Sequence, residues 1–208
     1  MKPVIGVDFD NTIVRYDELF HRIARERQLI PADIPVSKEL VRDYLRAADR
    51  EDDWTELQGY VYGARMDESA AFPGVLEFFA EAVRRGFDIV IISHKTLHPY
   101  LGEKHDLHRA ARHWLEINGF FDPSRIGMAP DKVFFEVTRA DKLGRIGQQK
   151  CTHFIDDLPE VLREEAFPAA ARRILFRPQG AEIPGAEDFF AVLSDWQQIA
   201  GYVWTLAP

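Results

Sequence analysis

The sequence is poor in cysteine, in long apolar runs and in positive charge. Cys151 is the only cysteine, so no intrachain disulfide can form, which is consistent with a reducing compartment. No stretch approaches the ~18 apolar residues of a membrane-spanning helix. The apolar N-terminal run is broken at Asp8, so we expect neither a signal peptide nor a membrane anchor. We therefore expect a cytoplasmic protein. The chain has 26 Lys and Arg residues and 34 Asp and Glu residues, which gives a net charge of −8. An acidic protein has no general electrostatic attraction for nucleic acid, so we do not expect long DNA or RNA as a partner.

Short apolar runs of strand length alternate with helix-patterned segments along most of the chain. The runs lie at 4–7, 88–92, 133–137, 152–155 and 174–176. Helices are predicted at 75–85, at 107–118, around Lys142, at 158–167 and at 188–204. This alternation predicts an α/β fold, a Rossmann-like parallel sheet sandwiched by helices. Ligands of such sheets bind at the carboxyl ends of the strands.

Residues 15–72 differ from the rest of the chain, being polar, aromatic and helix-patterned. Apolar stripes at 19–23, 40–45 and 54–61 indicate three helices, with Ser37 placed to cap the second. Pro73-Gly74 marks the return to the sheet pattern. We therefore predict a small helical domain at 15–72, inserted after the first strand into a core formed by 1–14 and 73–208.

Two carboxylates, Asp8 and Asp10, directly follow the first predicted strand. If the chain stays extended there, side chains two residues apart point the same way. A carboxylate can act as a nucleophile towards phosphorus, and a second one can transfer protons. Taken alone, the pair serves equally well as a cap for the following turn.

Asp156 and Asp157 end a second strand in the same manner. Taken alone, they are more simply read as the cap of the helix expected after them. Together with Asp8 and Asp10, however, they bring four carboxylates to one edge of the sheet, where like charges repel. A divalent cation with oxygen ligands relieves that repulsion, so the set predicts a metal site.

Ser93 and Lys142 complete the pattern. Ser93 ends the strand at 88–92, and Lys142 begins a helix after the strand at 133–137. Alone, they are an ordinary turn serine and a solvated lysine. Beside the carboxylates, their hydroxyl and ammonium groups suit a phosphoryl group.

These four elements, in this order, resemble the four motifs of the haloacid dehalogenase-like superfamily. Motif one resembles Asp8-Phe9-Asp10-Asn11-Thr12, motif two Ser93, motif three Lys142 and motif four Ile155-Asp156-Asp157. The resemblance spans roughly 3–14 and 73–178 and implies the fold of that superfamily.

The resemblance also implies a role for each residue. Asp8 is then the nucleophile and a ligand of Mg²⁺, and Asp10 is the acid/base, with its backbone carbonyl on the metal. Asp157 is the expected third protein ligand, with Asp156 in support. Thr12 steadies the motif-one loop and belongs to the substrate-binding set, while Ser93 and Lys142 hold the transferred phosphoryl group.

The function implied is that of a Mg²⁺-dependent phosphatase, hydrolysing a small-molecule phosphate monoester through an aspartyl-phosphate intermediate. The carboxylate at Asp10 disfavours dehalogenation, because dehalogenases of this family lack it and an alkoxide leaving group needs its proton. Two alternatives stay open: a phosphotransferase of the same fold, and a catalytically silent metabolite-binding protein. The physiological substrate and the oligomeric state are not predicted.

Two features depart from the commonest family pattern. Asn11 stands where glycine is frequent, which is tolerable because asparagine accepts left-handed backbone angles. Lys142 precedes Asp156 by only 14 residues (156 − 142), which leaves room for few helical turns. Lys132 and Lys95 are therefore kept as alternatives to Lys142.

The helical insertion occupies the position of a cap over the active site in this superfamily. Such a cap excludes water and favours a small phosphorylated metabolite, with Arg65 as the expected contact for a second anionic group. His94 and Lys95 directly follow Ser93 and are expected to line the substrate pocket. A zinc site among the histidines of 94–113 is a less favoured alternative, since no cysteine accompanies them.

Overall fold

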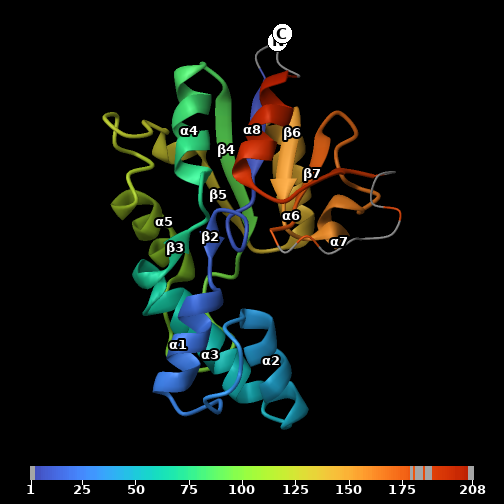
Figure 1. Ribbon diagram of the computed structural model, residues 1–208. Coiled ribbons are helices and arrows are strands. Elements are labelled where there is room, and N and C mark those ends of the chain that lie inside the picture. The colour runs from blue at the N-terminus through green and yellow to red at the C-terminus, as the bar shows by residue number, and fades with distance from the viewer. Residues whose placement is uncertain (1–2, 179, 181–184, 186–188, 206–208) are drawn as a thin grey trace. The chain divides into compact units, whose positions relative to one another are not determined.

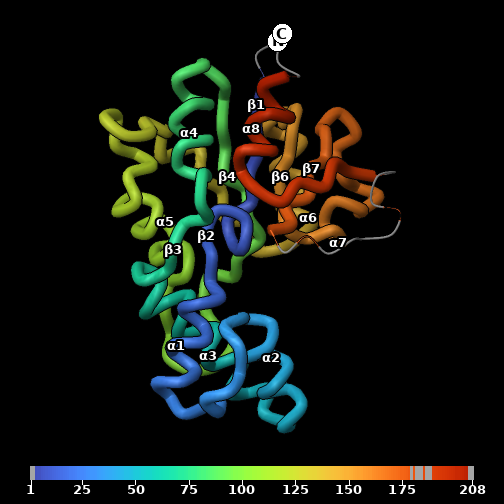
Figure 2. Tube along the Cα trace, viewed as in Figure 1, coloured from blue at the N-terminus to red at the C-terminus, as the bar shows by residue number. Residues whose placement is uncertain are grey.

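A computed structural model describes residues 3–178, 180, 185 and 189–205. The chain forms two compact units. The sheet unit comprises 1–13, 71–95 and 119–208, and the helical unit comprises 14–70 and 96–118. The second segment of the helical unit differs from the boundaries predicted above, which gave 96–118 to the core. Figure 2 follows the chain out of the sheet unit after the first strand and back again before the helix labelled α4.

The sheet unit is built on six parallel strands in the order β5-β4-β1-β6-β7-β8 (Figure 1). The strands are β1 (Val4–Val7), β4 (Asp88–His94), β5 (Val133–Glu136), β6 (His153–Asp156), β7 (Arg172–Phe176) and β8 (Ala191–Leu193). The predicted α/β fold with a parallel Rossmann-like sheet is confirmed. Because all six strands run in one direction, their carboxyl ends meet at one edge.

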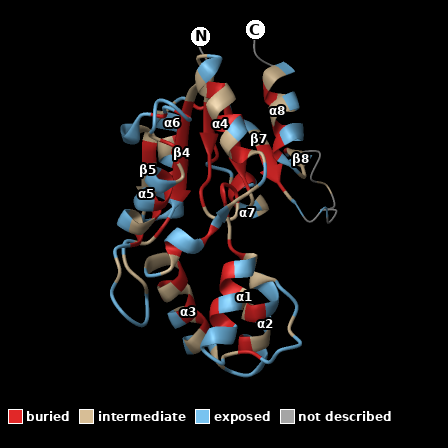
Figure 3. Cartoon of the chain, turned by 60° about the vertical axis from the view of Figure 1, so that its left-hand side comes forward, coloured by how far each residue is buried: buried red, intermediate tan, exposed pale blue. Residues whose placement is uncertain are grey.

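Helices cover both faces of this sheet. They are α4 (Val75–Arg84), α6 (Arg139–Gln148), α7 (Pro159–Leu162) and α8 (Trp196–Thr205), with the 3₁₀ turn η2 (Pro130–Lys132) before β5. On one face Trp196 of α8 contacts the rings of Phe78 in α4 and Phe176 in β7 at centroid distances of 5.0 and 5.6 Å. On the other face α6 and α7 bury their apolar residues against Val90 and Phe154. The strands are accordingly the most buried part of this unit (Figure 3).

The helical unit contains α1 (Asp17–Glu26), α2 (Lys38–Ala47), α3 (Glu51–Gly63), the 3₁₀ turn η1 (Met66–Glu68) and α5 (Leu107–Ile117). The pair β2 (Val14–Arg15) and β3 (Ala70–Ala71) forms a small two-stranded sheet. The three predicted helices are present, and Ser37 caps α2 by accepting a hydrogen bond from the Leu40 amide at 3.2 Å. Phe20 and Trp54 are buried, their rings 5.2 Å apart, so much of the aromatic content of this unit forms its core.

Two predictions near the C-terminus are wrong. A helix was expected at 158–167, but α7 ends after one turn, because the amides of Glu164 and Phe167 bond to carbonyls three residues back rather than four. A single helix was expected at 188–204, but the described residues form β8 followed by α8; residue 188 itself lies outside them. The apolar run of β8 is only three residues long, too short to be separated from a helix by its pattern.

No helix among the described residues is long and apolar enough to cross a membrane.

Candidate active site

Strand register brings the predicted site residues to one edge of the sheet. Val7 in β1 pairs with Ile91 of β4 on one side and Ile155 of β6 on the other. The Asp8 amide still donates to the Ile155 carbonyl at 2.8 Å, so the chain remains extended one residue past β1. Asp8 is thereby fixed beside Asp156, the last residue of β6.

Lys142 reaches this edge from the first turn of α6. Thr138 caps that helix by accepting a hydrogen bond from the Asp141 amide at 3.1 Å, and the buried face of α6 turns towards the sheet. The Lys142 ammonium donates to Asp8 at 2.6 Å and to Asp156 at 2.7 Å. The short interval between Lys142 and Asp156 is therefore long enough, and Lys132 lies half-buried in η2 instead.

Burial controls the charge balance of this group. The pKa of Asp8 is raised from 3.8 to about 7, mainly by burial; Lys142 opposes the rise, and the neighbouring Asp156 and Asp10 add to it. Burial would lower the pKa of Lys142, but the two carboxylates outweigh it and hold that pKa above its usual range. Lys142 therefore stays charged, and a bare carboxylate at Asp8 is costly.

Asp10 is positioned by a tight turn after Phe9. Asn11 adopts the left-handed backbone conformation (φ 57°), the conformation for which asparagine is suited, and the Ile13 amide bonds to the Phe9 carbonyl at 3.0 Å. The Asp10 carboxylate pairs with Lys95, whose Nζ lies 2.8 Å from Oδ2. Asp8 and Asp10 are thus each paired with a different lysine.

Three carboxylates lie close enough to share a cation. Ligand oxygens of Asp8, Asp156 and Asp157 all lie within 4.8 Å of one another. Such an all-oxygen set fits a hard divalent ion, and a cation there would favour the ionised form of the buried Asp8. Asp156 already accepts hydrogen bonds from Lys142 at 2.7 Å and from the Leu158 amide at 3.0 Å, which leaves Asp8 and Asp157 as the better-placed ligands.

A cavity of about 90 Å³ opens onto these groups. Residues at the carboxyl ends of the strands and in α6 and α7 line it: Asp8, Asp10, Asn11, Ser93, His94, Arg139, Lys142, Asp157, Leu158 and Val161. Ser93 is buried within β4, which runs to His94, beyond the predicted range of 88–92. A ring nitrogen of His94, Nε2, lies 3.0 Å from the Val137 carbonyl oxygen.

Arg139 is a cavity residue that the sequence analysis does not identify. It is the first residue of α6, and its Nη1 lies 3.1 Å from Glu164 Oε1. The available signal is its spacing, because a residue three positions before Lys142 lies on the same face of a helix.

Other predicted site residues lie elsewhere. Thr12 is buried and donates a hydrogen bond to Asp157 at 3.4 Å, so it links the loops after β1 and β6. Lys95 pairs with Asp10 and is not among the cavity-lining residues. Arg65 belongs to the helical unit, where its guanidinium contacts Glu68 and Glu26, and its predicted contact with substrate stays a prediction.

The histidines do not add a metal centre. Within the described ranges, the trio of Asp8, Asp156 and Asp157 is the one group of three ligand-type residues close enough to hold an ion. His98 Nδ1 instead lies 2.9 Å from the His105 carbonyl oxygen. The less favoured zinc alternative therefore has no counterpart in this part of the chain.

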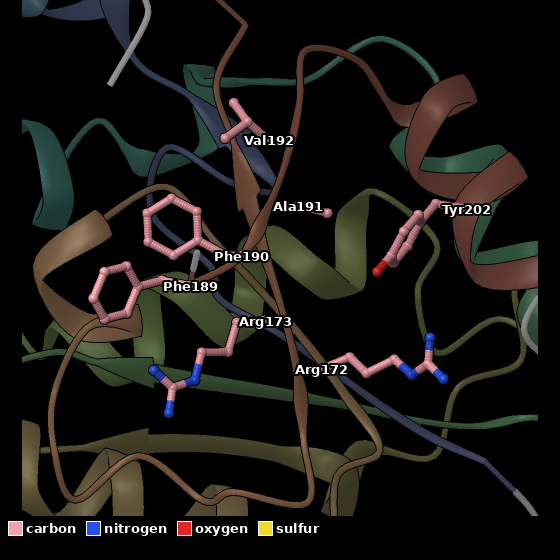
Figure 4. A pocket seen from close by; sticks show the side chains of 7 residues that line it. All are labelled: Arg172, Arg173, Phe189, Phe190, Ala191, Val192 and Tyr202. Carbon is pink, nitrogen blue, oxygen red and sulfur yellow. The ribbon is translucent and has the colours of Figure 1, made fainter. Parts of the chain in front are cut away.

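A larger cavity, of about 700 Å³, lies at the opposite edge of the sheet, where β7 and β8 begin (Figure 4). Its lining comprises Arg172, Arg173, Phe189, Phe190, Ala191, Val192 and Tyr202. Figure 4 shows the two phenylalanine rings on one side and Tyr202 on the other. None of these residues carries a carboxylate, so the chemistry available at Asp8 does not extend to this cavity.

Comparison with known proteins identifies the fold. No family model matches the chain, and no curated protein sequence matches it. Among solved structures, it is similar to the putative hydrolase YfnB from Bacillus subtilis bound to magnesium (TM-score 0.58, 12% identity, 97% of this chain and 98% of that one). It is also similar to a predicted phosphatase from Clostridium acetobutylicum (TM-score 0.59, 12% identity, 99% of this chain and 100% of that one). A dehalogenase is similar to the same degree (TM-score 0.60, 13% identity, 100% of this chain and 98% of that one). The fold is that of haloacid dehalogenase-like hydrolases, as the four motifs predicted.

Proposed function

We propose that this protein is a Mg²⁺-dependent phosphatase that hydrolyses a small-molecule phosphate monoester through an aspartyl-phosphate intermediate. One observation carries the proposal: Asp8, Asp10, Ser93 and Lys142 line a single small cavity at the carboxyl edge of the sheet. The cavity therefore combines a nucleophile, an acid/base, a hydroxyl donor and a fixed positive charge.

The first chemical step transfers the phosphoryl group to the protein. A carboxylate oxygen of Asp8 attacks phosphorus, the bond from phosphorus to the ester oxygen breaks, and that oxygen takes a proton from Asp10 and leaves as an alcohol. Lys142, already directed at Asp8, compensates negative charge on the phosphoryl oxygens, and the Ser93 hydroxyl donates to one of them.

The second step frees the protein. A water molecule gives a proton to Asp10 as its oxygen attacks phosphorus, the bond between phosphorus and Asp8 breaks, and inorganic phosphate leaves. Asp10 thus recovers the proton that it gave up in the first step. If an acceptor hydroxyl replaced this water, the same residues would act as a phosphotransferase.

The ion would be held by Asp8 and Asp157, with Asp156 in support. When bound, a divalent cation supplies positive charge that stabilises the phosphoryl oxygens and the ionised nucleophile. The Bacillus subtilis neighbour is described as bound to magnesium, and the all-oxygen ligand set of this chain suits the same ion.

The size of the cavity supports a phosphoryl group as its occupant. At about 90 Å³ it is far smaller than the ~300–1,000 Å³ of sites that enclose a whole small-molecule ligand, so the alcohol part of the ester must extend beyond it. Asp10 favours an ester over a halide, because a halide leaves without a proton whereas an alkoxide needs one.

Phosphate release from a panel of small esters, with Mg²⁺ and with EDTA, tests the proposal. We expect metal-dependent release by the wild-type protein and a loss of about 10⁴-fold or more in Asp8→Asn, because covalent transfer requires the carboxylate. The matched control is Asp131→Asn, which alters an exposed aspartate of the sheet unit and should leave turnover unchanged.

Three outcomes are informative. Near-normal turnover in folded Asp8→Asn would contradict the nucleophile assignment. Transfer to added alcohols or sugars in place of water would identify a phosphotransferase. Tight binding of an ester by folded wild-type protein, without release of phosphate, would indicate a silent binding protein.

A further inference from the structure

Lys95 lies in the sheet unit immediately after β4, and its side chain is almost fully buried. Its side chain is 3% exposed, and its Nζ lies 2.8 Å from Oδ2 and 3.1 Å from Oδ1 of Asp10. The same ammonium lies 5.7 Å from the centre of the Phe9 ring. Both oxygens of one carboxylate are thus held by a single buried cation.

The pairing is not explained by the needs of the backbone. The Lys95 amide already bonds to the Glu136 carbonyl at 2.8 Å, so β4 and β5 are joined there whatever the side chain does. A buried ion pair is also weak evidence for stability, because desolvation of the two charges offsets their attraction. The geometry instead restricts the Asp10 carboxylate, both oxygens of which lie within hydrogen-bond distance of the Lys95 ammonium.

We propose that Lys95 is a positioning residue for Asp10: it holds the carboxylate in the orientation from which it exchanges protons with the leaving oxygen and with water. This role rests on the proposed phosphatase function. The site then divides its two buried lysines by task. Lys142 serves Asp8 and the transferred phosphoryl group, and Lys95 serves Asp10.

This division predicts a dependence on the leaving group. An alkyl phosphate needs a proton on its departing oxygen, whereas p-nitrophenolate departs without one. In Lys95→Met, which removes the charge and keeps the length of the side chain, we expect the first turnover of an alkyl phosphate to slow by about tenfold to a hundredfold. That loss is part of the ~10²–10⁴-fold that general acid catalysis contributes. The rate of p-nitrophenol release in the first turnover should change by less than about threefold, because the departure of p-nitrophenolate does not use Asp10.

A kinetic double-mutant cycle separates positioning from a general loss of structure. If Lys95 acts only through Asp10, Lys95→Met should cost nothing further for the alkyl phosphate in a protein that already carries Asp10→Asn. Lys95→Arg keeps a positive charge, and it should lose less of the alkyl phosphate rate than Lys95→Met. It also serves as the second variant if Lys95→Met does not fold. Lys132→Met is the matched control, since Lys132 is only half-buried and lies outside the cavity lining.

The experiment is single-turnover rapid mixing of each protein, with Mg²⁺, against p-nitrophenyl phosphate and an alkyl phosphate. Equal losses on both esters, or a further loss of the alkyl rate in the Asp10→Asn background, would overturn the positioning role while leaving the phosphatase intact. No release of p-nitrophenol or of the alkyl alcohol by the wild-type protein would instead overturn the proposed function, and this role with it. Thermal unfolding of the wild-type protein, Lys95→Met, Asp10→Asn and the double variant reports the contact independently of turnover. If Lys95 and Asp10 contact each other directly, the melting-temperature losses of the two single variants should not add up in the double variant.

Discussion

Replacing Lys142 with methionine removes a cation that contacts two buried carboxylates, and the cost in stability follows from the geometry of that contact. Its Nζ lies 2.6 Å from Asp8 and 2.7 Å from Asp156, and the three side chains are 2%, 6% and 0% exposed. Removing one partner of a buried ion pair leaves an uncompensated charge and costs about 3–5 kcal/mol. Methionine keeps most of the side-chain volume, so the packing contribution to this loss is small.

The loss should appear in the free energy of unfolding of the metal-free protein at pH 8. Urea unfolding followed by tryptophan fluorescence measures it, and a loss of this size lowers the melting temperature of a chain of 208 residues by about 6–20 °C. Lys132→Met is the control, because Lys132 is half-buried in η2 and outside the cavity, and it should change stability by less than about 0.5 kcal/mol.

The free energy of unfolding should depend on pH in the direction set by the titration of Asp8. Its pKa is about 7 in the folded protein against an ordinary 3.8, so between these values the native state holds a proton that the unfolded state releases. Stability of the wild-type protein should therefore fall as pH rises from about 4 to about 7 and level off above it, and the penalty of Lys142→Met should be smaller at pH 5, where Asp8 is neutral. A loss below about 1 kcal/mol at pH 8, or one that does not change with pH, would refute this account of the site.

Three further predictions concern the metal, the thiol and a helix cap. Mg²⁺ at about 100 times its dissociation constant should stabilise the wild-type protein by about 2.7 kcal/mol. Asp157→Asn should need an Mg²⁺ concentration at least about tenfold higher for the same stabilisation. Equal Mg²⁺ titrations of the two proteins by thermal shift would exclude Asp157 as a ligand. Burial raises the pKa of Cys151 from 9.0 to about 12, so at pH 8 its thiolate is about a thousandfold scarcer than in the unfolded chain; iodoacetamide should label native protein correspondingly slowly, and rapid labelling would contradict this burial. Ser37→Ala should cost about 1 kcal/mol, because Ser37 Oγ accepts from the Leu40 amide at 3.2 Å; unchanged urea unfolding would show that the cap contributes nothing.

The class of fold and the carboxylates of the candidate site could be predicted from the sequence pattern. Strands buried on both faces must be almost wholly apolar, so β1, β4, β5 and β6 are visible as short runs, and the polar residues that end them are conspicuous. Asp8, Ser93 and Asp156 were found in this way, because parallel strands deliver their carboxyl ends to one edge whatever their order. The pattern failed where it was shortest, at α7 and at the three residues of β8.

The pairing of each lysine with its carboxylate, in contrast, depends on how the elements pack in three dimensions. The sequence does not distinguish Lys95, Lys132 and Lys142, because a charged residue has no periodic pattern. Its partner is the carboxylate that lies nearest to it in space. Packing of α6 against the sheet turns Lys142 to Asp8, and the pairing of β4 with β5 holds Lys95 beside Asp10. The assignment of 96–118 to the helical unit was equally invisible, because an amphipathic helix such as α5 shows that it has a buried face and not which unit buries it.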